Sequence, residues 1–120
     1  MKKIAVVDDD AGFGKLVHRI LEKHGYEPYL FLNAGEALEF IDETPVNLLI
    51  TDVLMPDMDG IELLTAIKRK IVGLPVIVMS GGGRVAADFY LETMRGLGAK
   101  HVLEKPFDTE KLLGMVAALV

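Results

Sequence analysis

Short apolar runs alternate along this chain with longer stretches in which apolar residues recur every three or four positions. Uninterrupted apolar runs are typical of strands covered on both faces of a sheet, whereas the longer spacing is typical of amphipathic helices. The pattern predicts strands at residues 3–7, 27–32, 48–52, 76–80 and 101–103. It predicts helices between residues 12 and 23, 33 and 45, 61 and 71, 84 and 97, and 108 and 119.

Polar and glycine residues mark the ends of these elements. Asp10, Asn33 and Asp108 each precede a helical stretch and are predicted N-caps, because their side-chain oxygens can accept from the first free backbone N–H groups. Gly25 and Gly98 follow helical stretches and are predicted stops. Three of the five predicted helices therefore have a candidate N-cap, and two have a candidate glycine stop.

Strict alternation of strands and helices predicts a doubly wound α/β fold with parallel strands, right-handed crossovers and helices on both faces. The known small sheet of this flavodoxin-like kind has five strands in the order 2-1-3-4-5, with a crevice between strands 1 and 3. At 120 residues, without a repeat or linker, the chain is predicted to form one domain, residues 1–120.

Composition narrows the setting of this domain. The chain has no cysteine, so neither disulfides nor thiolate metal sites are expected, and a reducing cytoplasm is the simplest location. Three aspartates interrupt the apolar start at residues 8–10, which argues against a signal peptide or membrane span. A net charge of -5 disfavours direct binding to nucleic acid.

The reactive side chains fall at the carboxyl ends of the predicted strands. Asp8 and Asp9 follow the first strand, Asp52 ends the third, Ser80 ends the fourth, and Lys105 follows the fifth. Since parallel strands point the same way, these ends meet at one edge of the sheet, where open α/β sheets bind ligands. The sequence thus predicts one site built from all five residues.

Carboxylates crowded at this edge would repel one another, and a divalent cation would offset the repulsion. Oxygen ligands without histidine or cysteine favour a hard ion such as Mg²⁺, which is often completed by a phosphate oxygen. Asp52 could then act as a nucleophile toward a phosphoryl group, with Ser80 and Lys105 binding the transferred oxygens.

The chain resembles the response-regulator receiver domains of two-component signalling over essentially its whole length. Four motifs carry the resemblance: VVDDD at 6–10, TDVLMPDMDG at 51–60, MSGG at 79–82 and EKPF at 104–107. It implies that Asp52 accepts the phosphoryl group from the phosphohistidine of a histidine kinase or a histidine phosphotransfer protein.

The resemblance also implies a set of ligands around Asp52. Asp9 would bind Mg²⁺ directly, Asp8 would bind it through water, and the backbone carbonyl of Leu54 would supply another ligand. Ser80 and Lys105 would hold the phosphoryl oxygens, and the peptide bond after Lys105 would be cis. A target protein would bind around the helix predicted at 84–97, the strand at 101–103 and the helix at 108–119.

Two features depart from the family pattern. Receivers usually carry an aromatic switch residue three positions before the lysine, where this chain has Val102, so the usual hydroxyl–aromatic coupling is in question. The glycine run at 81–83 replaces bulkier residues, and we expect a loop that closes only on the phosphoryl group. In the following helix, the apolar arc of residues 85–97 is either core or docking surface.

We expect a stand-alone switch without an output domain, which phosphorylates and dephosphorylates itself but is not a turnover enzyme. One alternative is a small phosphatase with Asp52 as nucleophile, against which the chain length and the apolar Leu54 both argue. A second is a pseudo-receiver that is never phosphorylated, against which the intact acidic and lysine positions argue.

Overall fold

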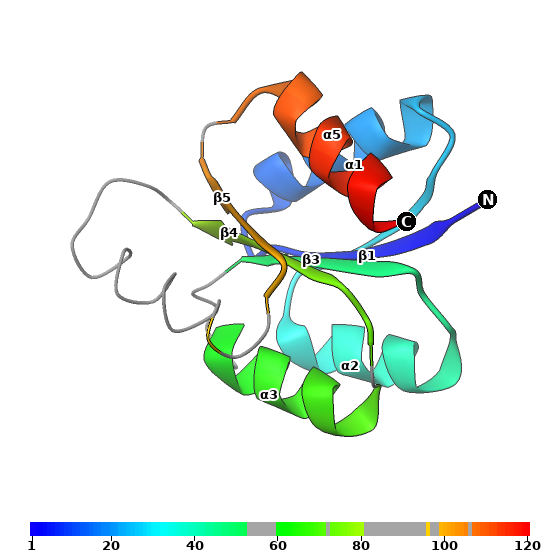
Figure 1. Ribbon diagram of the computed structural model, residues 1–120, viewed down its shortest axis with the longest axis vertical. Coiled ribbons are helices and arrows are strands. Elements are labelled where there is room, and N and C mark those ends of the chain that lie inside the picture. The colour runs from blue at the N-terminus through cyan, green and yellow to red at the C-terminus, as the bar shows by residue number, and fades with distance from the viewer. Residues whose placement is uncertain (53–59, 72, 81–95, 97–98, 106) are drawn as a thin grey trace.

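The computed structural model describes residues 1–52, 60–71, 73–80, 96, 99–105 and 107–120 (Figure 1). Five parallel strands form one sheet in the order β2-β1-β3-β4-β5. Their bounds are β1 Lys3–Val7, β2 Glu27–Phe31, β3 Leu48–Asp52, β4 Val76–Ser80 and β5 His101–Glu104. The predicted strand order is confirmed, and the predicted strand ends agree to within one residue.

Helices cover both faces of the sheet, as the alternating pattern predicts. Helices α1 (Ala11–Lys23) and α5 (Thr109–Leu119) lie on one face, and α2 (Ala34–Glu43) and α3 (Gly60–Lys70) lie on the other (Figure 1). None of these helices is long and apolar enough to span a lipid bilayer.

Two apolar clusters, one on each side of the sheet, explain why consecutive residues of the central strands are apolar. Alternate residues of β1 take part in different clusters: Ile4 and Val6 pack with α1 and α5, while Ala5 and Val7 pack with α2 and α3. All four side chains are fully buried. The sheet is therefore the middle of three layers, and the polar residues of the central strands lie at the strand ends.

The predicted helix caps are confirmed at two of three positions. Asp10 Oδ1 accepts from the backbone N–H of Phe13 at 3.1 Å, and Asn33 Oδ1 accepts from that of Glu36 at 2.9 Å. Asp108 occupies the cap position of α5, but its side chain makes no capping hydrogen bond. The side chain of Asp108 is therefore not the cap that the sequence predicts.

Gly25 and Gly114 should respond in opposite ways to the same substitution. Gly25, just past α1, has φ +86, and Gly114 lies within α5; an added Cβ meets nothing within 4 Å at either position. Gly25→Ala should lower the free energy of unfolding by about 1 kcal/mol through backbone strain, and Gly114→Ala should raise it by about 0.5 kcal/mol. Denaturant unfolding measures both; changes of the same sign would contradict this explanation.

Several sequence predictions lie outside the described residues. They concern Leu54, the glycine run at 81–83, most of the predicted helix at 84–97 and the peptide bond between Lys105 and residue 106. These remain predictions.

Candidate functional site

The sheet order brings the chemistry-bearing strand ends to one edge, as predicted. Strand β3 pairs with β1 on one side and with β4 on the other, and β4 pairs with β5. Asp8 and Asp9 follow β1, while Asp52 is the last residue of β3. Ser80 ends β4 and is buried, and its carbonyl oxygen accepts from the backbone N–H of Lys105 at 2.7 Å.

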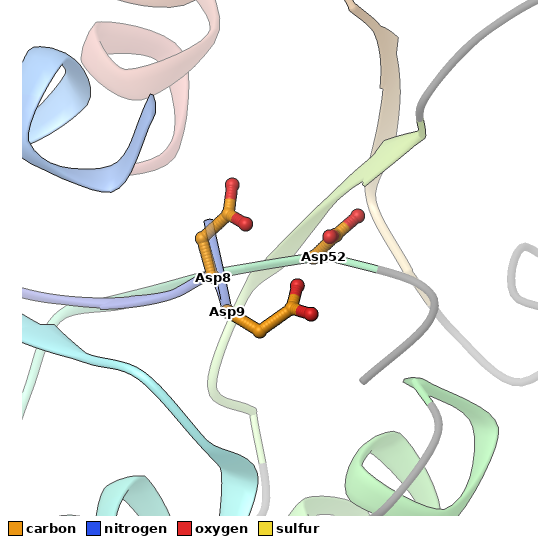
Figure 2. Close-up of side chains that lie close together, drawn as sticks. All are labelled: Asp8, Asp9 and Asp52. Atoms are coloured by element: carbon orange, nitrogen blue, oxygen red, sulfur yellow. The ribbon is translucent and has the colours of Figure 1, made fainter. Parts of the chain in front are cut away.

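Three carboxylates form the centre of this edge (Figure 2). One oxygen each from Asp8, Asp9 and Asp52 can be chosen so that all three lie within 4.8 Å of one another. Asp8 is fully buried, Asp52 is half-buried and Asp9 is exposed. Although Asp8 and Asp9 are consecutive, their side chains diverge, and Asp8 points toward the side of the sheet that carries α1 and α5 (Figure 2).

Lys105 is the cation of the cluster. Its Nζ lies 2.8 Å from Asp8 Oδ2 and 3.6 Å from Asp52 Oδ2, and its side chain is 16% exposed. Three carboxylates and one ammonium leave an excess of two negative charges among these four groups. A further cation at this site would offset the remaining negative charge.

Asp8 is held on several sides, which explains how a carboxylate can be fully buried. Its Oδ2 accepts from Lys105, and its Oδ1 accepts from the backbone N–H of Asp10 at 3.0 Å. Its own backbone N–H donates to the carbonyl oxygen of Phe31 at 3.1 Å. Buried charges persist when they are paired and hydrogen-bonded in this way. Asp10 thus serves as a helix cap and as a support for Asp8, in line with its predicted role as a cap.

The donor set fits a hard divalent cation. Each of the three acids offers one carboxylate oxygen within reach of a common point, and oxygen-only sets with excess negative charge are those that Mg²⁺ prefers. Asp9 is the most accessible of the three.

Phe13 is a contact of the site that the sequence analysis did not predict. The ammonium of Lys105 lies 4.4 Å from the centroid of the Phe13 ring. A signal for it existed, because Phe13 sits in the first turn of the helix that follows the acidic cluster and is capped by Asp10. Phe13 also packs against the apolar cluster on the α1 and α5 side of the sheet.

Val102, at the position of the usual aromatic switch, pairs in register with Val78 of β4 and is half-buried. It packs against the apolar cluster on the α2 and α3 side. A small β-branched side chain therefore fills this position.

The fold and the site place the chain in a class of flavodoxin-like α/β domains. These domains have an acidic cluster suited to Mg²⁺ at the carboxyl edge of the sheet. A family model described as "Response regulator receiver domain" matches residues 4–117. The chain belongs to this family.

Relatives and solved structures agree with this assignment. The chain is 34% identical to the response regulator receiver protein CpdR of Brucella abortus over 120 residues, covering 100% of this chain and 98% of CpdR. It is 34% identical to the transcriptional regulatory protein FixJ of Bradyrhizobium diazoefficiens over 117 residues, covering 98% of this chain and 56% of FixJ. Thus it spans only about half of FixJ.

Among solved structures, the response regulator TrrA of Thermotoga maritima in complex with Mg(2+)-BeF superimposes with a TM-score of 0.89. It is 28% identical, and the match covers 100% of both chains. Chemotaxis protein CheY4 of Vibrio cholerae matches with a TM-score of 0.87 and 26% identity, covering 100% of this chain and 99% of CheY4.

The chain is thus a receiver domain of two-component signal transduction, and its role is that of a signalling regulator. Domains of this family bind Mg²⁺ at an acidic pocket, and this chain has such a cluster. Neither the phosphatase nor the pseudo-receiver is favoured by these relatives.

Proposed function

We propose that this receiver takes a phosphoryl group onto Asp52 from the phosphohistidine of a histidine kinase or a histidine phosphotransfer protein. The observation that carries the proposal is the position of the Asp52 carboxylate. It ends a central strand, is half-buried, and has the Lys105 ammonium 3.6 Å from its Oδ2. Nucleophile and charge-stabilising cation thus come from rigidly paired parts of one sheet.

In the proposed reaction, a carboxylate oxygen of Asp52 attacks the phosphorus atom. The new O–P bond forms as the N–P bond to the donor imidazole breaks, and the electron pair returns to the histidine nitrogen, which takes up a proton from solvent. Lys105 and the Ser80 hydroxyl bind the oxygens of the transferred group. The chain thereby stores the group as an acyl phosphate.

The residues proposed to hold Mg²⁺ are Asp9 and Asp52 directly, Asp8 through a water molecule, and the backbone carbonyl of Leu54. The closeness of the three carboxylates and their excess negative charge support this set. Bound Mg²⁺ supplies positive charge to the phosphoryl oxygens during transfer. Lys105 adds a second positive charge on the Asp8 side of the site.

Downstream, we propose that phosphorylation changes a surface through which a target protein binds. This surface comprises β5, α5 and the segment at 84–97, for which the sequence predicts a helix. The backbone hydrogen bond from Lys105 to Ser80 supports a link between the site and this surface, because it ties the end of β5 to the end of β4. Val102 in place of an aromatic residue implies that this coupling does not use a rotating ring. We place the domain in the cytoplasm, where histidine kinases present their phosphohistidine.

Phosphoryl incorporation from acetyl phosphate, with Mg²⁺ or with EDTA, tests the proposed function. Intact-protein mass should show one phosphoryl group that requires Mg²⁺, and borohydride reduction followed by peptide sequencing should place it at Asp52. Steady release of phosphate from many esters would instead indicate a phosphatase. A protein that gains no group and releases none would be a pseudo-receiver.

Mg²⁺ should raise the thermal midpoint of the domain, because a ligand that binds the folded state adds RT ln(1 + [L]/Kd) to its stability. Asp9→Asn should weaken this response about tenfold in apparent affinity, by removing one charged ligand. Since Asp9 is exposed, the substitution leaves the buried pair of Asp8 and Lys105 in place. A thermal-shift titration in which Asp9→Asn matched the unsubstituted protein would exclude Asp9 as a ligand.

A further inference from the structure

The ammonium of Lys105 lies between two carboxylates and one aromatic ring. Asp8 Oδ2 is 2.8 Å and Asp52 Oδ2 is 3.6 Å from Nζ, and the centroid of the Phe13 ring is 4.4 Å away. The last distance is well within the range of a cation–π interaction, which strengthens as the cation loses water. With only 16% of its side chain exposed, Lys105 is largely out of solvent.

The ring of Phe13 is held in place from two directions. At its backbone, the N–H of Phe13 donates to Asp10 Oδ1, and the N–H of Asp10 donates to Asp8 Oδ1. At its edge, the ring meets that of Phe107 with centroids 5.4 Å apart and planes at 89°. Such edge-to-face pairs are favourable beyond their buried area. Phe107 lies two residues after Lys105, so the ring and the ammonium are fixed by the same two segments of chain.

The arrangement addresses a problem that lysine poses at a reaction centre. Its side chain has four rotatable bonds, and ordering it costs conformational entropy. A further carboxylate could order it, but would also neutralise its charge. An aromatic face attracts the ammonium without adding negative charge, so the full charge of Lys105 remains available to carboxylate and phosphoryl oxygens.

We propose that Phe13 is a positioning residue for Lys105, and that it aims the ammonium at the phosphoryl group as Asp52 accepts it. The role rests on the proposed function, because it concerns the same transfer. Phe13 acts through Lys105, whose ammonium lies over its ring. The Lys105 ammonium, which contacts both the Phe13 ring and the Asp8 carboxylate, thereby connects the start of α1 to the segment after β5.

Three variants test this role by the rate of phosphoryl incorporation from acetyl phosphate at saturating Mg²⁺. Phe13→Leu keeps an apolar side chain but loses the aromatic face, and should slow incorporation about tenfold. Phe13→Tyr keeps the face and should restore the rate. Phe40→Leu is the matched control: Phe40 is also half-buried and packs on Phe31, but it lies in α2 on the opposite face of the sheet. It should leave the rate unchanged.

A second measurement, made without Mg²⁺ or phosphoryl donor, reads the contact itself. The ε-methylene protons of Lys105, assigned by loss of their signal in Lys105→Arg, should show an upfield ring-current shift in the unsubstituted protein and in Phe13→Tyr. The shift should disappear in Phe13→Leu and persist in Phe40→Leu.

The outcomes separate this inference from the proposed function. If the unsubstituted protein gains a phosphoryl group and Phe13→Leu gains it equally fast, the positioning role is overturned while the proposed function stands. A lysine shift that survives in Phe13→Leu, or equal slowing in Phe40→Leu, would also overturn the role. Failure of the unsubstituted protein to gain any phosphoryl group would overturn both proposals.

Discussion

Asp52→Asn should abolish phosphoryl incorporation from acetyl phosphate, so that the intact mass stays at that of the unmodified chain with Mg²⁺ present. The amide of asparagine has nearly the shape of the carboxylate, but it carries no charge and its oxygen is a poor nucleophile. The loss should therefore be complete rather than partial. A suitable control is Asp42→Asn, which removes an exposed carboxylate in α2 that pairs with Lys70 at 2.8 Å, away from the site.

The same substitution should not unfold the protein. In EDTA, Asp52→Asn removes one of three neighbouring like charges and leaves Lys105 paired with Asp8, so the free energy of unfolding should stay equal or rise. Loss of the adduct together with an intact cooperative transition would assign the effect to chemistry. An adduct that persisted in Asp52→Asn would show that another side chain accepts the group.

The fold was predictable because a strand that lies between two layers of helices is apolar at consecutive positions. A run such as Leu48, Leu49 and Ile50 must bury every side chain, since odd and even positions face different apolar clusters. Alternation with helices then restricts the topology to parallel strands with crossovers of one hand. These restrictions leave few possible orders for five short strands.

The location of the site was equally predictable, because a parallel sheet gathers its carboxyl ends. Asp8, Asp52 and Lys105 meet at one edge, although 97 residues separate the first from the last. Their pairing was not predictable from topology alone. Whether Lys105 approaches Asp8 or Asp52 more closely depends on the course of the chain after β5 and on side-chain rotamers, neither of which leaves a periodic signal.

The different burial of Asp8 and Asp9 has a simple origin in strand geometry. Asp8 continues the alternation of Ile4 and Val6, whose side chains face α1 and α5, and this is the side on which Phe13 and Lys105 lie. Asp9 falls on the other parity and remains exposed. Extending the alternation of β1 past Val7 would therefore have predicted from the sequence that Asp8 is buried and Asp9 is exposed.

Lys105→Met should lower the free energy of unfolding in EDTA by about 3 kcal/mol, the cost typical of breaking a buried ion pair from one side. Methionine keeps most of the apolar length of lysine but leaves Asp8, which is fully buried, without its cation and near the charge of Asp52. Mg²⁺ should recover part of the loss, because a divalent cation offsets the same repulsion. Denaturant unfolding with and without Mg²⁺ measures both effects.

Lys70→Met is the matched control for this prediction, because Lys70 also lies 2.8 Å from a carboxylate oxygen, that of Asp42, but with 49% of its side chain exposed. Solvent screens that pair, so its loss should cost less than about 1 kcal/mol and should not respond to Mg²⁺. Similar losses for Lys105→Met and Lys70→Met would show that burial of Asp8 does not make it depend on Lys105. A large loss at Lys105 alone, reduced by Mg²⁺, would establish that lysine and metal compensate the same cluster of carboxylates.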